Sequence, residues 1–315
     1  MLASVSILKY LVADKWTNDM TDEHDNTPPA PPALKANDAV SRMTALKAIK
    51  SKLISTIIKM RVNSLGREVS FREVTVAEQK KLARIMIDNE NRKDIVYDAQ
   101  CAILKSICLE DDVDIYNLTE FDKIKLLLLL YQRNMAKHEI TFVCPECHSE
   151  NKCWIDFNNA IVRLDAFDIS DKEFVYENNA WKFVFTIGYP LVSRVSQFYA
   201  SQYSGARRQL DRRTAESLNS SINIDYINLF IKKMCFTDKS TGETTTVDSQ
   251  DYTIDEILDV ISVLPQDVMY AENGLTQYIT QNFISSINDT FDKHRCGVCG
   301  KMCESLSDQS VDGFL

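Results

Sequence analysis

The sequence predicts an α+β protein, mainly α-helical, in which small β-hairpins form a split four-cysteine zinc knuckle. Helices are indicated by apolar residues that recur at three- and four-residue spacing over much of the 315-residue chain. Hairpins are indicated by short β-branched and aromatic runs that flank turn residues. The knuckle is indicated by two Cys-x-x-Cys pairs among nine cysteines. A hydrophobic content of 45% is enough to bury a sizeable core.

Residues 1–66 are predicted to be an arm outside the main domain. Residues 1–33 combine a short amphipathic segment with a proline-rich tether at residues 28–32, a composition typical of an extended chain. Residues 34–66 are predicted to form one long helix, because their apolar residues recur at helical spacing. Residues 35–67 carry eight lysines and arginines against a single acid. We expect this arm to hold another protein, although packing within the chain would also explain its apolar face.

Residues 67–139 are predicted to be a helical subdomain that starts with a strand at residues 68–74. The first helix begins at Thr75-Val76-Ala77-Glu78, a capping box in which the first and last side chains satisfy free backbone N–H groups. A second helix is expected over residues 94–109. A third, strongly apolar helix is expected over residues 120–135, and it leads directly into the first cysteine pair.

Residues 140–190 are predicted to contain the first knuckle, which is the turn that holds Cys144 and Cys147, and a second hairpin. That hairpin joins residues 174–176 to residues 181–187 around two asparagines. Residues 191–315 are predicted to return to helices and then, from residue 287, to a strand that leads into the second knuckle. The helices expected in this last part cover residues 191–203, 225–236 and 257–263, and Pro265 opens a further one.

The two cysteine pairs are predicted to share one zinc ion. Two residues between the cysteines of a pair let both thiolates bind zinc at about 2.3 Å, but a structural site needs four ligands. We therefore expect one site formed by Cys144, Cys147, Cys296 and Cys299. Closing the intervening loop costs about 4 to 5 kcal/mol. Structural zinc contributes about 10 to 16 kcal/mol in small peptides, so the metal outweighs the closure.

Other interpretations of the cysteines stay open. Residues 144–148 also match the Cys-x-x-Cys-His pattern of covalent haem attachment, and any Cys-x-x-Cys can be a redox pair. A more local metal site would recruit other candidates, namely Cys153, Cys303, His148 and His294. The remaining cysteines lie in apolar, helix-like patterns and are expected to be plain buried residues: Cys101, Cys108 and Cys235.

Composition disfavours several classes of function. A net charge of −9 disfavours nucleic acid as the main partner. Tyr199 and Tyr203 precede a run of arginines, a pattern that can stack on bases, but acids among the arginines favour a solvated face. Phosphate-binding glycine loops, Gly-x-Ser-x-Gly and His-Glu-x-x-His are absent from the sequence. Because four thiolates leave zinc no open position, we expect a structural ion and no enzyme.

The sequence also predicts where the protein acts. No run reaches the 18 apolar residues of a membrane span, and the first residues lack the features of an export signal. We therefore expect a cytosolic chain with reduced thiols.

Several stretches occur in an order that resembles a known family. They are the helix at 118–132, the run Arg133-Asn134-Met135-Ala136-Lys137-His138, the first knuckle, TIGYPLV at 186–192, the second knuckle at 296–300 and VDGFL at 311–315. In this order the chain resembles, over residues 68–315, the baseplate hub assembly proteins of contractile-tailed phages of the T-even type. His148 departs from the family pattern, which has glycine at that position. The arm at residues 1–66 is an addition to that pattern.

The resemblance implies a viral protein that helps to build the central hub of the tail baseplate. It would act in the host cytoplasm, as an assembly factor or chaperone, by binding hub or tape-measure proteins in a hetero-oligomer. One alternative is a permanent structural subunit of the virion baseplate. A second alternative, which the acidic charge disfavours, is a zinc-ribbon regulator that binds nucleic acid.

Overall fold

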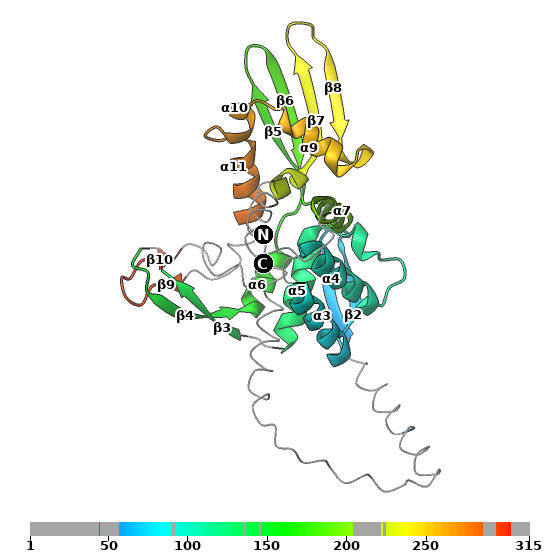
Figure 1. The fold of residues 1–315 in the computed structure, drawn as a ribbon, viewed down its shortest axis with the longest axis vertical. Coiled ribbons are helices and arrows are strands. Elements are labelled where there is room, and N and C mark those ends of the chain that lie inside the picture. The colour runs from blue at the N-terminus through cyan, green and yellow to red at the C-terminus, as the bar shows by residue number, and fades with distance from the viewer. Residues whose placement is uncertain are drawn as a thin grey trace.

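The computed structural model has three parts: a helical layer, a four-stranded sheet covered by short helices, and a narrow projection of two small hairpins (Figure 1). The predicted α+β class is confirmed, with helix forming about half of the structure rather than most of it. The predicted tether at 1–33 lies outside the described residues, as does nearly all of 34–56. The structure describes residues 44, 57–89, 92–134, 137–144, 146–203, 222, 225–285 and 294–303.

The first described element is a β-hairpin rather than the end of a long helix. Strand β1 (Ile57–Val62) pairs antiparallel with β2 (Arg67–Arg72). Alternate residues of β1 are buried, so its second, fourth and sixth side chains face the core. The helix predicted over residues 34–66 is therefore wrong for residues 57–62. The apolar spacing there fits a period of two as well as a helical period, and pairing with β2 decides between them.

The helical layer agrees with the sequence prediction. It consists of α3 (Val76–Asp88), α4 (Lys93–Ile107), α5 (Glu120–Asn134) and α7 (Val192–Gln202). The predicted capping box at the start of α3 is present, with both reciprocal hydrogen bonds between Thr75 and Glu78. Among the described residues, no helix combines the length and the apolar character that crossing a membrane requires.

The sheet has the strand order β5-β6-β7-β8, with each pair antiparallel: β5 (Lys172–Glu177), β6 (Trp181–Ile187), β7 (Ile231–Asp238) and β8 (Thr244–Asp248). The β5–β6 hairpin confirms the prediction. The helix predicted over 225–236 is wrong from Ile231 onward, so Cys235 lies on a strand. A short apolar run does not distinguish a strand from a helix, and contacts with β6, such as Phe236 with Phe183 at 5.1 Å between ring centres, settle it.

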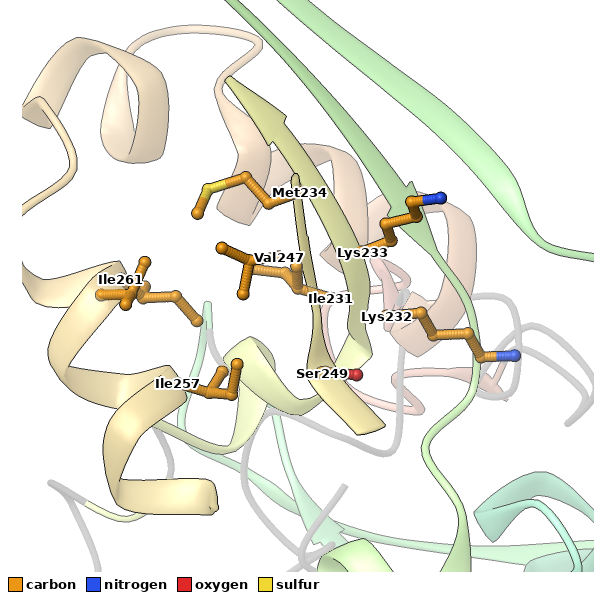
Figure 2. A pocket seen from close by; sticks show the side chains of 9 residues that line it. Ile231, Lys232, Lys233, Met234, Val247, Ser249, Ile257 and Ile261 are labelled. Atoms are coloured by element: carbon orange, nitrogen blue, oxygen red, sulfur yellow. The ribbon is translucent and has the colours of Figure 1, made fainter. Parts of the chain in front are cut away.

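Short helices pack beside this sheet. They are α9 (Ile254–Ser262), α10 (Gln266–Tyr270) and α11 (Leu275–Ile279), with α9 and α10 at the predicted positions. A hollow remains between α9 and strands β7 and β8, where Ile257 and Ile261 face Met234 and Val247 (Figure 2). The ammonium groups of Lys232 and Lys233 point away from it. Apart from Ser249 and the two lysines, the residues that line the hollow are apolar, so we interpret it as packing space.

The remaining elements are short connections. The helix α6 (Phe157–Asp165) follows the first cysteine hairpin and buries one face. Three 3-10 helices cover Ile115–Asn117, Asn228–Phe230 and Ser249–Asp251, and a π-helical turn covers Thr280–Ile284.

Tyr189 joins the sheet to the helical layer. Its ring is 1% exposed and lies 5.1 Å from Phe121 of α5, 5.8 Å from Phe230 and 5.3 Å from Phe283, measured between ring centres. Its hydroxyl donates to the Phe283 carbonyl at 3.0 Å. One core cluster therefore extends from β1 to the π-helical turn. The predicted division into 67–139, 140–190 and 191–315 stays a prediction.

The first two turns of α5 contain buried charges, although the sequence predicts an apolar helix. Asp122 accepts hydrogen bonds from Asn63 N at 2.7 Å, Ser64 N at 3.2 Å and Thr119 Oγ1 at 2.7 Å. Each of these donors would be costly to leave without a partner in the interior. Asp122 therefore fastens the β1–β2 turn to the start of α5.

Lys125 holds the same turn from the other side. Its ammonium group donates to Arg61 O at 2.6 Å and to Asn63 Oδ1 at 2.7 Å, and it pairs with Asp165 of α6 at 2.5 Å. A buried charge is tolerated when it is paired and fully hydrogen-bonded. These contacts join β1, α5 and α6 into one rigid unit.

A second buried cluster lies between α4, α5 and α7. Lys123 Nζ lies 3.2 Å from Glu120 Oε1 and 3.4 Å from the centre of the Tyr97 ring, and the Tyr97 hydroxyl donates to Glu120. Burial, followed by the charge of Glu120, raises the pKa of Tyr97 well above its usual range. Tyr199 and Tyr203 are also buried, at 6% and 2% exposure, so neither ring is free to stack on nucleic-acid bases.

We expect Asp122→Ala to destabilise the protein by about 3 kcal/mol, because it removes the acceptor of the Asn63 and Ser64 amides and of the buried Thr119 hydroxyl. Chemical denaturation followed by circular dichroism measures this change. Asp111→Ala is the control: Asp111 is exposed, and we expect an effect within about 0.5 kcal/mol. Equal effects of the two substitutions would contradict the role given to Asp122.

Candidate metal centre

The first cysteine pair lies in a tight turn between two strands. Strand β3 (Lys137–Val143) pairs antiparallel with β4 (Glu150–Asp156), which confirms the predicted hairpin. At the tip, Cys144 N donates to Ser149 O at 2.9 Å and His148 N donates to Cys144 O at 2.9 Å. His148 adopts φ 55, in the left-handed region that usually favours glycine. The backbone of His148 therefore adopts the conformation that glycine would adopt most easily in this turn.

The second pair repeats this geometry. Cys296 N donates to Lys301 O at 2.8 Å, and Gly300 N donates to Cys296 O at 3.0 Å. Gly300 has φ 73 and occupies the position equivalent to His148. The flanking strands are β9 (His294–Arg295) and β10 (Met302–Cys303), which pair with each other. We call β3, β4, β9, β10 and their two turns the cysteine arm.

The structure brings the four predicted sulfur atoms together. Cys144 Sγ lies 3.7 Å from Cys299 Sγ, and Cys147 Sγ lies 3.6 Å from Cys296 Sγ. All four lie within 4.8 Å of one another. Four sulfurs placed 2.3 Å from a central zinc ion in a tetrahedron are about 3.8 Å apart. The cluster therefore has the composition and the spacing of a closed metal site, and its sulfurs are too far apart for disulfides, whose S–S bond is about 2.05 Å.

The alternatives weighed from the sequence fare differently. His148 is exposed and does not belong to the cluster. The side chains of Cys153, Cys303 and His294 lie outside what the structure describes. A haem would need Cys144 and Cys147 for its thioether bonds, whereas their sulfurs face the second knuckle. The three cysteines expected to be buried lie outside the cluster: Cys101 is buried, and Cys108 and Cys235 are half-buried.

Hydrogen bonds make the four thiols electrostatically unequal. The Ser149 hydroxyl, followed by the Cys299 amide, lowers the pKa of Cys296 to about 5. The Ser149 hydroxyl also lowers the pKa of Cys147. The Lys301 amide acts to lower the pKa of Cys299, but desolvation and the neighbouring sulfurs outweigh it and raise the pKa to about 12. Cys296 therefore loses its proton more readily than Cys299. A bound dication would offset the repulsion between neighbouring thiolates.

The two turns of the cysteine arm bring together the buried side chains of Cys144 and Cys296. Three larger apolar side chains of the arm are exposed, namely Trp154 at 59%, Val298 at 73% and Met302 at 43%. A two-stranded hairpin is marginally stable in water by itself. A metal ion at the four sulfurs would therefore add a strong interaction between the two hairpins.

Comparison with known proteins gives one match. A family model described as T4 bacteriophage base plate protein matches residues 54–302. The matched region starts just before β1 and contains all four cysteines of the cluster. No match was found among curated proteins, and none among solved structures.

We expect the protein to bind one zinc ion, and we expect Cys296→Ser to abolish that binding and loosen both hairpins, because the two pairs share the ion. Metal analysis gives the zinc content, and hydrogen exchange gives the protection of residues 137–156 and 294–303. Residues of α5 should stay protected, since they belong to the continuous apolar core outside the cysteine arm. Cys235→Ser is the matched control and should leave the zinc content unchanged. Full zinc content in Cys296→Ser would show that the pairs do not share a site.

We expect His148→Gly to stabilise the cysteine arm by up to about 1 kcal/mol, because a left-handed conformation costs an L-residue about 1–2 kcal/mol and glycine much less. The reverse change in the other knuckle, Gly300→Ala, should destabilise it by about 1 kcal/mol. Space does not limit that change, since nothing lies within 4 Å of a Cβ added at Gly300. Zinc competition with a chelator measures both. Shifts of the same sign would argue against the shared turn geometry.

Proposed function

The chain belongs to the T4 bacteriophage base plate protein family, and from that membership we propose that it is a non-enzymatic protein that helps to build the central hub of the tail baseplate. Its coarser role, as a structural or assembly protein of a phage baseplate, follows from the family. The observation that carries the proposal is the extent of the match, which spans the core of the body and the cysteine arm. We expect it to bind hub or tape-measure proteins in a hetero-oligomer, during assembly in the host cytoplasm.

The proposed ligand set supports a structural metal. Four thiolates complete the tetrahedral coordination of zinc, so no position stays open for a substrate or an activated water. Among the side chains that the structure describes, no oxygen or nitrogen ligand of the kind that catalytic zinc sites recruit belongs to the cluster. We therefore propose one structural zinc ion whose task is to fasten the second knuckle to the first.

The buried cluster of Glu120, Lys123 and Tyr97 is also unsuited to catalysis. Glu120 and Lys123 are 2% and 1% exposed, and Tyr97 is 2% exposed, so a substrate cannot reach them without local unfolding. Each of the three is used by the others as a hydrogen-bond or cation–π partner. This arrangement supports a packing role at the junction of α4, α5 and α7.

A regulator that binds nucleic acid is the less favoured alternative. The chain carries a net charge of −9, which repels phosphate groups. The two tyrosines whose sequence position invites base stacking are buried. A gel-shift titration with DNA at low salt distinguishes this alternative, because binding there would favour a regulator over an assembly protein.

We expect the full-length chain, tagged and expressed during infection, to capture other baseplate proteins, with hub components most enriched. Mass spectrometry of the captured material measures this, and parallel analysis of purified particles tells an assembly factor from a permanent subunit. An assembly factor is abundant in the lysate and absent from particles, whereas a subunit is present in both. A variant without residues 1–33 is expected to capture less, since the N-terminal arm predicted over residues 1–66 is expected to hold partners. Capture of no baseplate protein by the full-length chain would contradict the proposal.

A further inference from the structure

Two side chains that are not predicted metal ligands connect the two knuckles. Ser149 lies just before β4, and its Oγ is 3.0 Å from Cys147 Sγ and 3.3 Å from Cys296 Sγ. It therefore contacts one sulfur of each pair, across a sequence separation of 147 residues on the longer side. Asn151, on β4, lies two residues further along the chain.

Asn151 fixes both Ser149 and the second knuckle. Its Nδ2 donates to Ser149 O at 2.8 Å and to Ser149 Oγ at 3.1 Å. Its Oδ1 accepts from Gly297 N at 2.8 Å, inside the second Cys-x-x-Cys turn. The amide therefore presents its donor side to the first knuckle and its acceptor side to the second.

These contacts determine what the Ser149 hydroxyl does. A hydroxyl has one hydrogen to donate and lone pairs that accept. Ser149 Oγ accepts from Asn151, and its own hydrogen is free to donate to a thiolate of Cys147 or Cys296, which both lie within reach. A hydrogen bond to a thiolate is charge-assisted and stronger than one between neutral groups.

We propose that Ser149 is a positioning residue of the metal centre, which holds Cys147 and Cys296 at tetrahedral spacing, and that Asn151 orients it. This inference rests on the metal site proposed above. Four thiolates around one dication leave a net negative charge, and donors around the sulfurs disperse it. Partners of this kind orient metal ligands and typically change metal affinity 10–100-fold when they are removed.

The second knuckle provides a control contact, which also joins the two knuckles but involves no sulfur. Lys301 is equivalent to Ser149, because the carbonyl of each accepts from the first cysteine amide of its knuckle. The Lys301 ammonium group reaches across to Glu146 of the first knuckle and forms an ion pair, with half of each side chain exposed. An exposed ion pair contributes little. Lys301→Ala therefore removes a contact between the knuckles that does not involve sulfur.

The test compares full-length variants loaded with cobalt alone, whose thiolate charge-transfer and ligand-field absorption bands report the ligand geometry. Zinc affinity is then measured by competition with a chromophoric chelator. We expect Ser149→Ala to weaken zinc binding 10–100-fold and to shift the charge-transfer band, and Ser149→Thr to restore both. Asn151→Ala, which leaves the hydroxyl in place without its orienting donor, should have a smaller effect of the same sign. Lys301→Ala should change the affinity less than threefold and leave the spectrum unchanged.

Each outcome separates the inference from the proposal on which it rests. If the unaltered protein binds cobalt with a thiolate spectrum and Ser149→Ala binds it equally well, the metal site stands and the role of Ser149 is wrong. Equal weakening in Ser149→Ala and Lys301→Ala without a spectral shift would reduce Ser149 to general packing, which also overturns the inference. Absence of cobalt–thiolate bands in the unaltered protein would overturn the metal site itself.

Discussion

The meeting of two distant cysteine pairs is the constraint on which the architecture depends. Cys147 and Cys296 are separated by 149 positions, yet their sulfurs lie 3.6 Å apart. All the chain between them, including the whole four-stranded sheet and α7, is therefore a loop whose ends close at the cysteine arm. Closing such a loop costs about 4 to 5 kcal/mol, which depends only weakly on its length. The continuous apolar core to which this part of the chain contributes offsets much of that cost.

The base of the cysteine arm is rigid for a reason that lies inside the body. Helix α5 ends at Asn134 and β3 begins at Lys137, so the helix leads almost directly into the first hairpin. The start of α5 is fastened to β1 by Asp122 and, with α6, by Lys125. Since α6 follows β4, the contact between α5 and α6 fixes both strands of this hairpin where they leave the body. These contacts thus fix the position of the first knuckle relative to α5 and α6, and the second knuckle packs against it.

The sequence was sufficient to predict that the four sulfurs lie together, and insufficient for parts of the scaffold. The coordination number of zinc predicted that the two cysteine pairs meet, because two thiolates alone do not complete a structural zinc site. The runs at 57–62 and 231–236 were assigned to helices, since short apolar runs fit both periods and only pairing with β2 and β6 decides. The charges of α5 gave no periodic signal of burial, because their partners, such as Asn63, come from elsewhere in the fold. Ser149 was missed for the same reason: only the docked knuckle reveals what its hydroxyl contacts.

The body and the cysteine arm are held together by different physical means, and this bears on how the protein takes part in an assembly. The apolar core around Tyr189 is stabilised by burial, whereas the two turns of the cysteine arm meet through the sulfurs of its four cysteines. Apolar burial is always present in water, but a thiolate site needs both reduced sulfur and free metal. If the four sulfurs hold a metal ion, its loss would therefore loosen the cysteine arm and leave the apolar core in place. A shared ion would also cross-link two segments that lie 149 positions apart in the chain.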